Sequence, residues 1–230
     1  MPSHPASQHP AGLVPATLLA LAAILAWDAS GLDLPLAHAI AGGHGFPLRH
    51  DALLLRVLHD GGRWLSWALA LALCLGVWWP FGALRQLRTG QRLQLAVGVL
   101  AAGLAVTVLK GWTQTSCPWD LADFGGVARY TSHWSGVPDG GPGHCFPAGH
   151  AAAGFAFVSG FFAFRGTAPP IARRWLAAAV GAGLLFGIAQ QVRGAHFLSH
   201  TLWTAWICWV VCGVVDRSFA AAAQRTANAA

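Results

Sequence analysis

The sequence contains no glutamate and only one lysine, Lys110, among its 230 residues. Charged side chains make up 10% of the chain, which is low for a soluble domain of this size. The eight acidic residues are all aspartates and form no Asp-x-Asp cluster, which argues against chemistry that depends on Mg²⁺. This scarcity of charge favours an integral membrane protein and leaves a soluble, wholly buried helical bundle as the alternative.

Hydrophobic residues, in contrast, make up 55% of the chain and gather in long runs. The formal net charge of +6 could suggest a nucleic-acid partner, but the arginines cluster in short segments between apolar runs, as they do in membrane loops. Twelve tryptophans, many of them near the ends of those runs, are typical of side chains anchored at a membrane surface. We therefore expect a lipid bilayer around the chain and no nucleic acid.

The apolar runs predict an all-α integral membrane protein with six transmembrane helices in one domain, residues 12–216. The connection of residues 28–63 contains only apolar stretches too short to span, so we expect short interfacial helices in this first outer loop. Residues 1–11 are predicted to be disordered and residues 217–230 to form a short tail. A cleaved signal peptide is the alternative for the first run, although no Lys or Arg precedes it. The six predicted spans cover residues 12–27, 64–83, 93–109, 147–164, 175–191 and 197–215.

The arginine distribution predicts the orientation of these spans. The loops of residues 84–92 and 165–174, together with the tail, contain eight of the fourteen Lys and Arg residues. The positive-inside rule makes that side cytoplasmic. Lys110, His150 and the turn of residues 192–196 then share the outer face with the long polar loop between the third and fourth spans. Segments far apart in the sequence converge there, which predicts a functional site.

The segment PAGH, which ends at His150, predicts the start of a helix, because proline is tolerated in a first helical turn. The unpaired amides of residues 148–150 would attract an anion, and Gly149 leaves room for a bulky one. Lys110 and Arg193 would neutralise the charge of a phosphate group. One histidine could attack phosphorus while another protonates the leaving group.

Three segments in this order resemble a known family: Lys110-x6-Cys117-Pro118, Pro147-Ala148-Gly149-His150, and the segment from Arg193 to His200. They resemble the motifs KxxxxxxRP, PSGH and SRxxxxxHxxxD of the type-2 phosphatidic acid phosphatase (PAP2) superfamily of membrane lipid phosphatases and phosphotransferases. The resemblance covers about residues 93–215 and implies a six-helix membrane core. It implies that His196 is the nucleophile, that His150 is the general acid and that Lys110 binds phosphate. With the residues argued from chemistry, the expected catalytic residues are His150, His196 and His200, and the expected substrate-binding residues are Lys110, Ala148, Gly149 and Arg193.

The chain departs from the family pattern at four positions. Cys117 stands where the first motif has arginine, and Ala148 replaces the serine of the second. Counting six residues back from His196 reaches Gln190 instead of arginine, and counting four forward reaches His200 instead of aspartate. His200 lies one helical turn beyond His196 on the same face, so it is the expected orienter of that ring. The other residues offered as replacements are Arg193 and Arg129 for the arginines and Asp120 and Asp123 for the carboxylate.

The sequence also predicts where the cysteines and the remaining histidines lie. Cys117 and Cys145 lie near the two ends of the predicted outer loop, so we expect a disulfide between them. The histidines of residues 28–63 are expected at the interface or in solvent, with His59, beside Asp60, as the one most expected to reach the site. Apolar packing is expected for the cysteines within spans, Cys74, Cys208 and Cys212.

The leading hypothesis is an enzyme that hydrolyses or transfers a phosphomonoester or diphosphate of a lipid at the outer face of a bacterial-type inner membrane. It would work through a phosphohistidine, with no metal and no other cofactor. One alternative is a metal-dependent membrane hydrolase with His196, His200, His150 and Cys117 or Cys145 as ligands. The other is a non-catalytic relative that binds lipid phosphate or a partner protein. The sequence names neither the lipid nor the oligomeric state.

Overall fold

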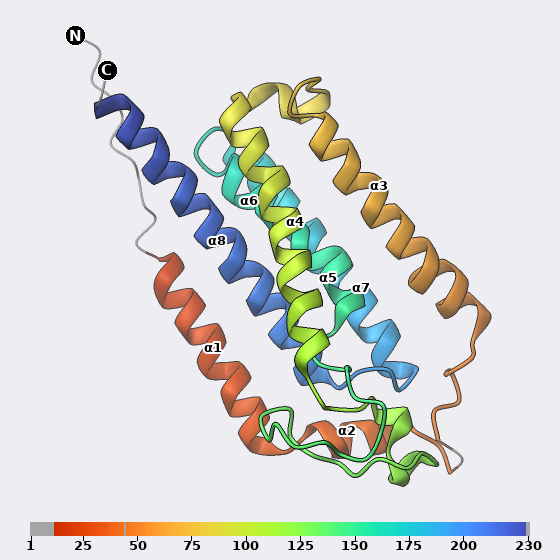
Figure 1. Ribbon diagram of the computed structural model, residues 1–230. Helices are drawn as coiled ribbons and strands as arrows, with labels where there is room; N and C mark the ends of the chain where they lie inside the picture. Colours follow the sequence, from red (N-terminus) through yellow and green to blue (C-terminus); the bar gives the residue numbers. More distant parts are fainter. Residues whose placement is uncertain (1–11, 44, 229–230) are drawn as a thin grey trace.

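The computed structural model describes residues 12–43 and 45–228, and its regular elements are helices. The segment predicted to be disordered, residues 1–11, lies outside the described residues. Figure 1 shows long helices side by side, with short helices and loops gathered at one end. The α-helices are α1 (Leu13–Ser30), α2 (Asp33–Ile40), α3 (Gly62–Leu75), α4 (Thr89–Trp112), α5 (Gly149–Phe155), α6 (Ser159–Phe164), α7 (Pro169–Val192) and α8 (Leu198–Asn228).

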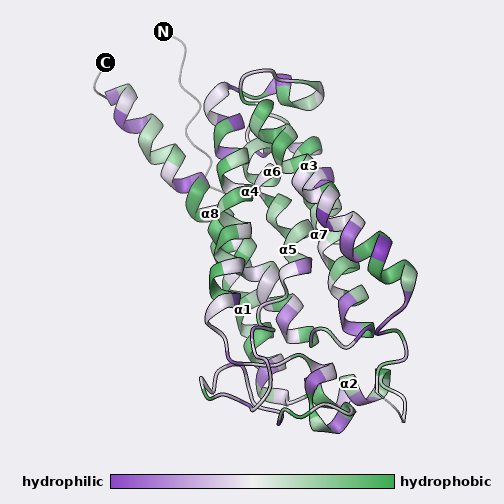
Figure 2. Ribbon diagram, turned by 45° about the vertical axis from the view of Figure 1, so that its right-hand side comes forward, coloured by the Kyte–Doolittle hydropathy of each residue, from purple (hydrophilic) through white to green (hydrophobic). Residues whose placement is uncertain are grey.

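Four helices, α1, α4, α7 and α8, are long and apolar enough to cross a bilayer. Figure 2 shows hydrophobic residues along much of their length. Their outward faces carry large apolar side chains, such as Leu19 at 73% and Leu104 at 63% exposure, which a surrounding bilayer would cover. In the place of the fourth predicted span, α5 and α6 form a shorter apolar stretch, Gly149–Phe164. These helices support the membrane association that the composition predicted.

Two predicted boundaries differ from the structure. The second predicted span, residues 64–83, is interrupted because α3 ends at Leu75 and a turn through Gly76 and Pro80 leads to a 3₁₀ helix, Gly82–Gln86. Glycine and proline interrupt a helix that the apolar run alone would continue. The sixth predicted span and the tail form one helix, since α8 continues to Asn228 through an alanine-rich segment with high helix propensity.

The segment before α3 holds one separate short helix and one that is continuous with α3. The separate helix is α2, and the other is a π-helix, Leu54–Gly61, that runs directly into α3. Asp51 caps the helical residues 52–53 that lead into it, because the backbone N–H of Leu54 donates to Asp51 Oδ1 at 2.9 Å. The π-helix carries His59 and Asp60 near its end. Such helices occur frequently at functional sites.

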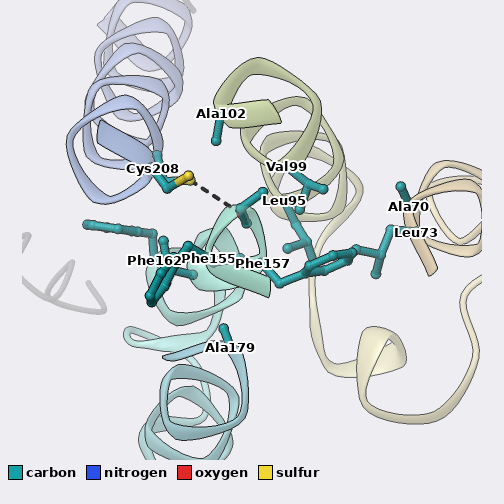
Figure 3. Packing of buried hydrophobic residues seen from close by; sticks show 14 of the residues in the cluster. Ala70, Leu73, Leu95, Val99, Ala102, Phe155, Phe157, Phe162, Ala179 and Cys208 are labelled. Carbon is teal, nitrogen blue, oxygen red and sulfur yellow. Dashed lines mark hydrogen bonds between the residues drawn. The ribbon is translucent and has the colours of Figure 1, made fainter. Parts of the chain in front are cut away.

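The core of the bundle lies around α5 and α6, which pack against α4, α7 and α8. Gly154 faces Gly183 of α7 so closely that a Cβ on Gly154 would collide with the backbone of Gly183. Figure 3 shows Phe155, Phe157 and Cys208 among the buried residues of this core. Cys208 and Cys212 are free and buried, which confirms the packing role predicted for them. The packing of α5 against α4, α7 and α8 fixes where its first residues lie.

The two ends of the bundle differ in which segments of the chain lie there. The end of α4, the start of α5 and the turn between α7 and α8 meet α2 and the long loop at the lower end in Figure 1. The Trp119 N–H of the loop donates to the carbonyl of Gly194 in that turn, at 2.9 Å. Gly194 has φ +78°, and a Cβ there would collide with the Phe46 ring, so the turn requires glycine. The predicted convergence of the motif segments at one end of the bundle is confirmed.

Candidate active site

A disulfide joins Cys117 to Cys145, with their Cα atoms 5.1 Å apart, which confirms the predicted bond. Beside it, the backbone N–H groups of His144 and Cys145 donate to the carbonyl groups of Thr113 and Thr115, respectively. The disulfide and these hydrogen bonds hold the residues before α5 against those that follow α4. The long loop therefore leaves and returns at one place, next to the start of α5.

Lys110 lies at the end of α4, beside the first residue of α5. A Cβ placed on Gly149 would lie 3.6 Å from Lys110 Cδ, so the lysine side chain runs past the start of the helix. Among the described residues, Lys110 forms no salt bridge. A cation without a counter-ion next to the free amides of a helix N-terminus favours a bound anion.

Ala148, the N-cap residue of α5, does not offer its amide to a ligand. Its N–H donates to the carbonyl of His200 at 3.3 Å, and the residue is fully buried. The Thr204 hydroxyl adds a second link between the two helix starts, 2.7 Å from His200 O and 3.3 Å from Ala148 O. The expectation that three amides hold the anion is therefore wrong for Ala148. The amides of Gly149 and His150 remain.

His150 presents a polar atom that nothing in the described chain satisfies. Its Nε2 is buried and has no hydrogen-bond partner. Its ring stacks on that of His59, with centroids 3.8 Å apart, and His59 Nδ1 lies 2.8 Å from Asp60 Oδ1. The hydrogen bond with His59 lowers the pKa of the Asp60 carboxyl. The structure thus brings His59 to the site, as expected, and leaves His150 able to exchange a proton with a ligand.

His196 and His200 form a buried pair at the start of α8. Their Nδ1 atoms lie 3.4 Å apart, and the residues are only 4% and 1% exposed. Burial, reinforced by the positive charge of Lys110 and by the two other histidines nearby, holds the pKa of His196 well below its ordinary value. His196 is therefore neutral near pH 7. When its Nδ1–H donates to His200, its Nε2 lone pair is the one available for attack.

Arg193 is buried beside the residue that replaces the third-motif arginine. Its Nη1 donates to Gln190 Oε1 at 2.9 Å, and its Nε donates to the carbonyl of Arg49 at 3.2 Å. The guanidinium groups of Arg49 and Arg193 both lie over the Trp119 ring, 4.8 and 5.7 Å from its centroid. Arg193 therefore places positive charge next to the Gln190 position, and Arg49 adds a second guanidinium that the sequence did not suggest.

These contacts bring all three predicted motif segments into one site. A family model described as the PAP2 superfamily matches residues 91–223, more than half of the chain. The chain belongs to the PAP2 superfamily. Its members are phosphatases, which supports phosphoric-ester hydrolysis as the general chemistry of the site. No curated protein and no solved structure matches the chain.

The structure also shows where the replacements offered for the missing PAP2 groups lie. Arg129 is exposed on the loop. Asp120 accepts a hydrogen bond from Trp119 Nε1 at 3.0 Å, and burial raises the pKa of its carboxyl. Asp123 lies 3.1 Å from His38 on an exposed surface. The group that the structure places on His196 is His200, so neither of these two aspartates is its orienter.

The predicted metal-binding alternative is not supported. The disulfide consumes the thiols of both Cys117 and Cys145, which that alternative required as ligands. Within residues 12–43 and 45–228, no group of three or more histidine, cysteine or carboxylate side chains is arranged to hold a metal ion. The histidines of the site lie instead as a stacked pair and a hydrogen-bonded pair.

Three further residues near the site were missed from the sequence. Asp33, at the start of α2, accepts a hydrogen bond from the Ser199 N–H at 3.1 Å and so caps α8 from another part of the chain. Asp28 and His133 lie 3.3 Å apart, and the His133 ring meets the His200 ring edge to face. Asp28 directly follows the first predicted span, so its place at the same end of the bundle as the site could have been inferred. His133 lies in a polar loop without periodicity, and no sequence signal marks it.

Proposed function

We propose that this PAP2 protein is a membrane phosphatase or phosphotransferase that removes a phosphate from a lipid phosphomonoester or diphosphate through a phosphohistidine, without a metal. The observation that carries the proposal is the neutral, buried His196, hydrogen-bonded to His200 at the end of the bundle that holds Lys110 and His150. A neutral imidazole with one nitrogen held and the other available is the form required of a nucleophile.

The proposed reaction has two steps. In the first, the Nε2 lone pair of His196 forms a bond to phosphorus, the bond from phosphorus to the lipid oxygen breaks, and that oxygen takes a proton from His150, which carries it once the negative charge of the substrate phosphate is bound beside the ring. Lys110 and the amides of Gly149 and His150 hold the non-bridging oxygens, and Arg193 adds positive charge. In the second, His150 takes a proton from water, whose oxygen attacks phosphorus and releases His196. A phosphotransferase would use an acceptor hydroxyl instead of water.

The proposal also covers the orientation of the protein in the membrane and the way a lipid substrate would bind. We propose a single domain of six membrane-spanning helices over residues 12–216, with the site facing outward from a bacterial-type inner membrane. The support is the clustering of eight of the fourteen Lys and Arg residues in the segments at the opposite end. The head group would bind at the outer face while the tail stays in the bilayer.

Phosphate release by the detergent-purified protein, measured with a panel of lipid phosphates, tests this proposal. The panel would include phosphatidate, phosphatidylglycerophosphate, undecaprenyl diphosphate and a lipid A phosphate. We expect release from at least one of them in the presence of EDTA, inhibition by vanadate, and an acid-labile phosphorylated intermediate that the His196→Ala variant lacks. Binding of these lipids without release by the unaltered protein would instead identify a non-catalytic relative.

A further inference from the structure

We propose that Asp28 and His133 are positioning residues for the nucleophile. They supply through His200 the negative charge that the aspartate of the third PAP2 motif would otherwise supply directly. The inference rests on the proposed function and adds to it a carboxylate from α1, outside all three motifs and outside the part of the chain that matches the family.

Asp28 is a carboxylate that accepts fewer hydrogen bonds than its two oxygen atoms allow. Its side chain is only 10% exposed, and Oδ2 accepts hydrogen bonds from the indole N–H groups of Trp203, at 2.8 Å, and Trp134, at 3.0 Å. Oδ1 is buried and has no hydrogen-bond partner. Among the residues that the structure describes, no lysine or arginine pairs with Asp28; the group at salt-bridge distance is His133 Nε2, at 3.3 Å, in an orientation that does not complete a hydrogen bond. A buried carboxylate of this kind strongly favours positive charge nearby.

His133 connects this carboxylate to the pair of catalytic rings. It is 7% exposed and stacks on Phe146, with centroids 4.1 Å apart and planes 13° apart. The His133 and His200 rings meet edge to face, with centroids 5.9 Å apart and an interplanar angle of 89°. Burial lowers the pKa of His133, against the opposing effect of Asp28. His133 therefore lies between the Asp28 carboxyl group and the His200 ring.

His200 lies between the proposed nucleophile, His196, and the His133 ring. Besides His133 and His196, its ring contacts the rings of Phe146 and Phe197 edge to face, at centroid distances of 5.2 and 5.4 Å. As His196 attacks phosphorus, positive charge develops on its ring and spreads to His200 through the shared Nδ1 proton. The Asp28–His133 dyad stabilises that charge by Coulomb attraction, and no proton leaves the four-residue group.

The other charged groups around these rings do not offer the same stabilisation. Lys110 of α4 and His150 of α5 face His196 and oppose a positive charge on it. A positive charge on His200 is opposed by His133 when that ring is itself protonated, and by Lys110. Asp33 of α2 faces His133, across a cavity of about 210 Å³ that Asp28 also lines. However, Asp33 Oδ1 already accepts hydrogen bonds from the Ser199 N–H and from Trp27 Nε1. Asp28 is therefore the carboxylate available to the histidine pair.

Steady-state kinetics of the Asp28→Asn variant across pH test the inference. We expect kcat to fall roughly tenfold to a hundredfold while KM changes less than about twofold, because the dyad acts on charge that develops only in the transition state. We also expect the acid limb of the kcat profile to move to lower pH by roughly half a unit, since a lost negative charge lowers the pKa of the nearby histidine pair. The matched control is Asp123→Asn, which removes an exposed carboxylate at the same end of the molecule.

Unchanged kcat, or a fall in kcat with an unmoved acid limb, would overturn the inference and leave Asp28 a structural residue. If Asp28→Asn does not purify as a folded protein, His133→Phe decides by the same criteria, since it keeps the ring stacked on Phe146. Carbon-13 NMR titration of the His200 ring, assigned with His200→Gln, separates this inference from the proposed function. Asp28→Asn should change the titration of the His200 ring even if the unaltered protein releases no phosphate, and an unchanged titration would count against the dyad.

Discussion

The rings of His59 and His150 stack with centroids 3.8 Å apart and planes 29° apart, which joins the π-helix before α3 to the first turn of α5. Two imidazoles at this distance do not readily hold protons together, because like charges repel. The Asp60 carboxylate, 2.8 Å from His59 Nδ1, holds the His59 ring in place. The stack therefore fixes the plane of His150 and with it the direction of its unpaired Nε2.

Replacing His59 by glutamine removes the stacked ring and retains a polar side chain. We expect kcat to fall by roughly threefold to tenfold with little change in KM, because His150 keeps its proton but loses part of its orientation. The matched control is His38→Gln, since His38 also pairs with an aspartate but is 50% exposed on the surface. An unaltered kcat for His59→Gln would show that the stack does not orient the acid.

Substitutions of His150, His196 and His200 should have graded effects on kcat. We expect His196→Ala and His150→Ala to lose more than about 10³-fold in kcat, since each removes a reacting group. His200→Ala should be impaired but measurable, because the nucleophile survives without its orienter. His200→Asp should retain activity, since a carboxylate accepts the His196 Nδ1–H. His196→Ala with most of the phosphatase activity intact would refute the proposed mechanism.

The sequence predicted the contacts that depend on local spacing or on span counting. The i, i+4 spacing of His196 and His200 predicted their contact, and the outer placement of Cys117 and Cys145 predicted the disulfide. It did not predict the bond from the Ala148 amide to His200 or the place of Arg49 over Trp119. Those contacts join separate segments whose relative position is set by packing, and no periodicity encodes it.

Removing the disulfide should loosen the start of α5. The Cys117→Ser/Cys145→Ser variant is expected to lose about 3.6 kcal/mol of stability in the chain-entropy account of a loop with a sequence separation of 28. Thermal unfolding in detergent, followed by tryptophan fluorescence, measures the loss, and a reducing agent should reproduce it in the unaltered protein. Cys74→Ser is the control, because Cys74 is free. Equal midpoints for the double variant and the unaltered protein would contradict the expectation.

Cysteine labelling should report the proposed orientation. Val137 lies on the long loop and is 59% exposed, whereas the neighbouring Asp139 is 5% exposed and accepts hydrogen bonds from Ser116. A Val137→Cys variant should therefore react with a membrane-impermeant maleimide in intact spheroplasts. An Arg173→Cys variant, in the arginine-rich segment at the other end, should react only after lysis. The reverse pattern would place the site on the cytoplasmic side.

Acidification should destabilise the folded protein, and His196 should contribute to this effect. The pKa of this ring is well below its ordinary value of 6.5 in the folded state, because burial disfavours its charged form. Between that depressed pKa and pH 6.5 the unfolded chain binds more protons than the folded one, so stability falls as pH falls. The stabilisation is complete above pH 6.5, and each pH unit below it costs up to about 1.4 kcal/mol for one such group.

Midpoints of unfolding at pH 7.5, 6.5 and 5.5 measure the slope, which His196→Gln should reduce. His133 has a lowered pKa for the same reason, so part of the slope should remain in that variant. A slope that is the same with and without His196 would show that its imidazole is not held neutral by burial.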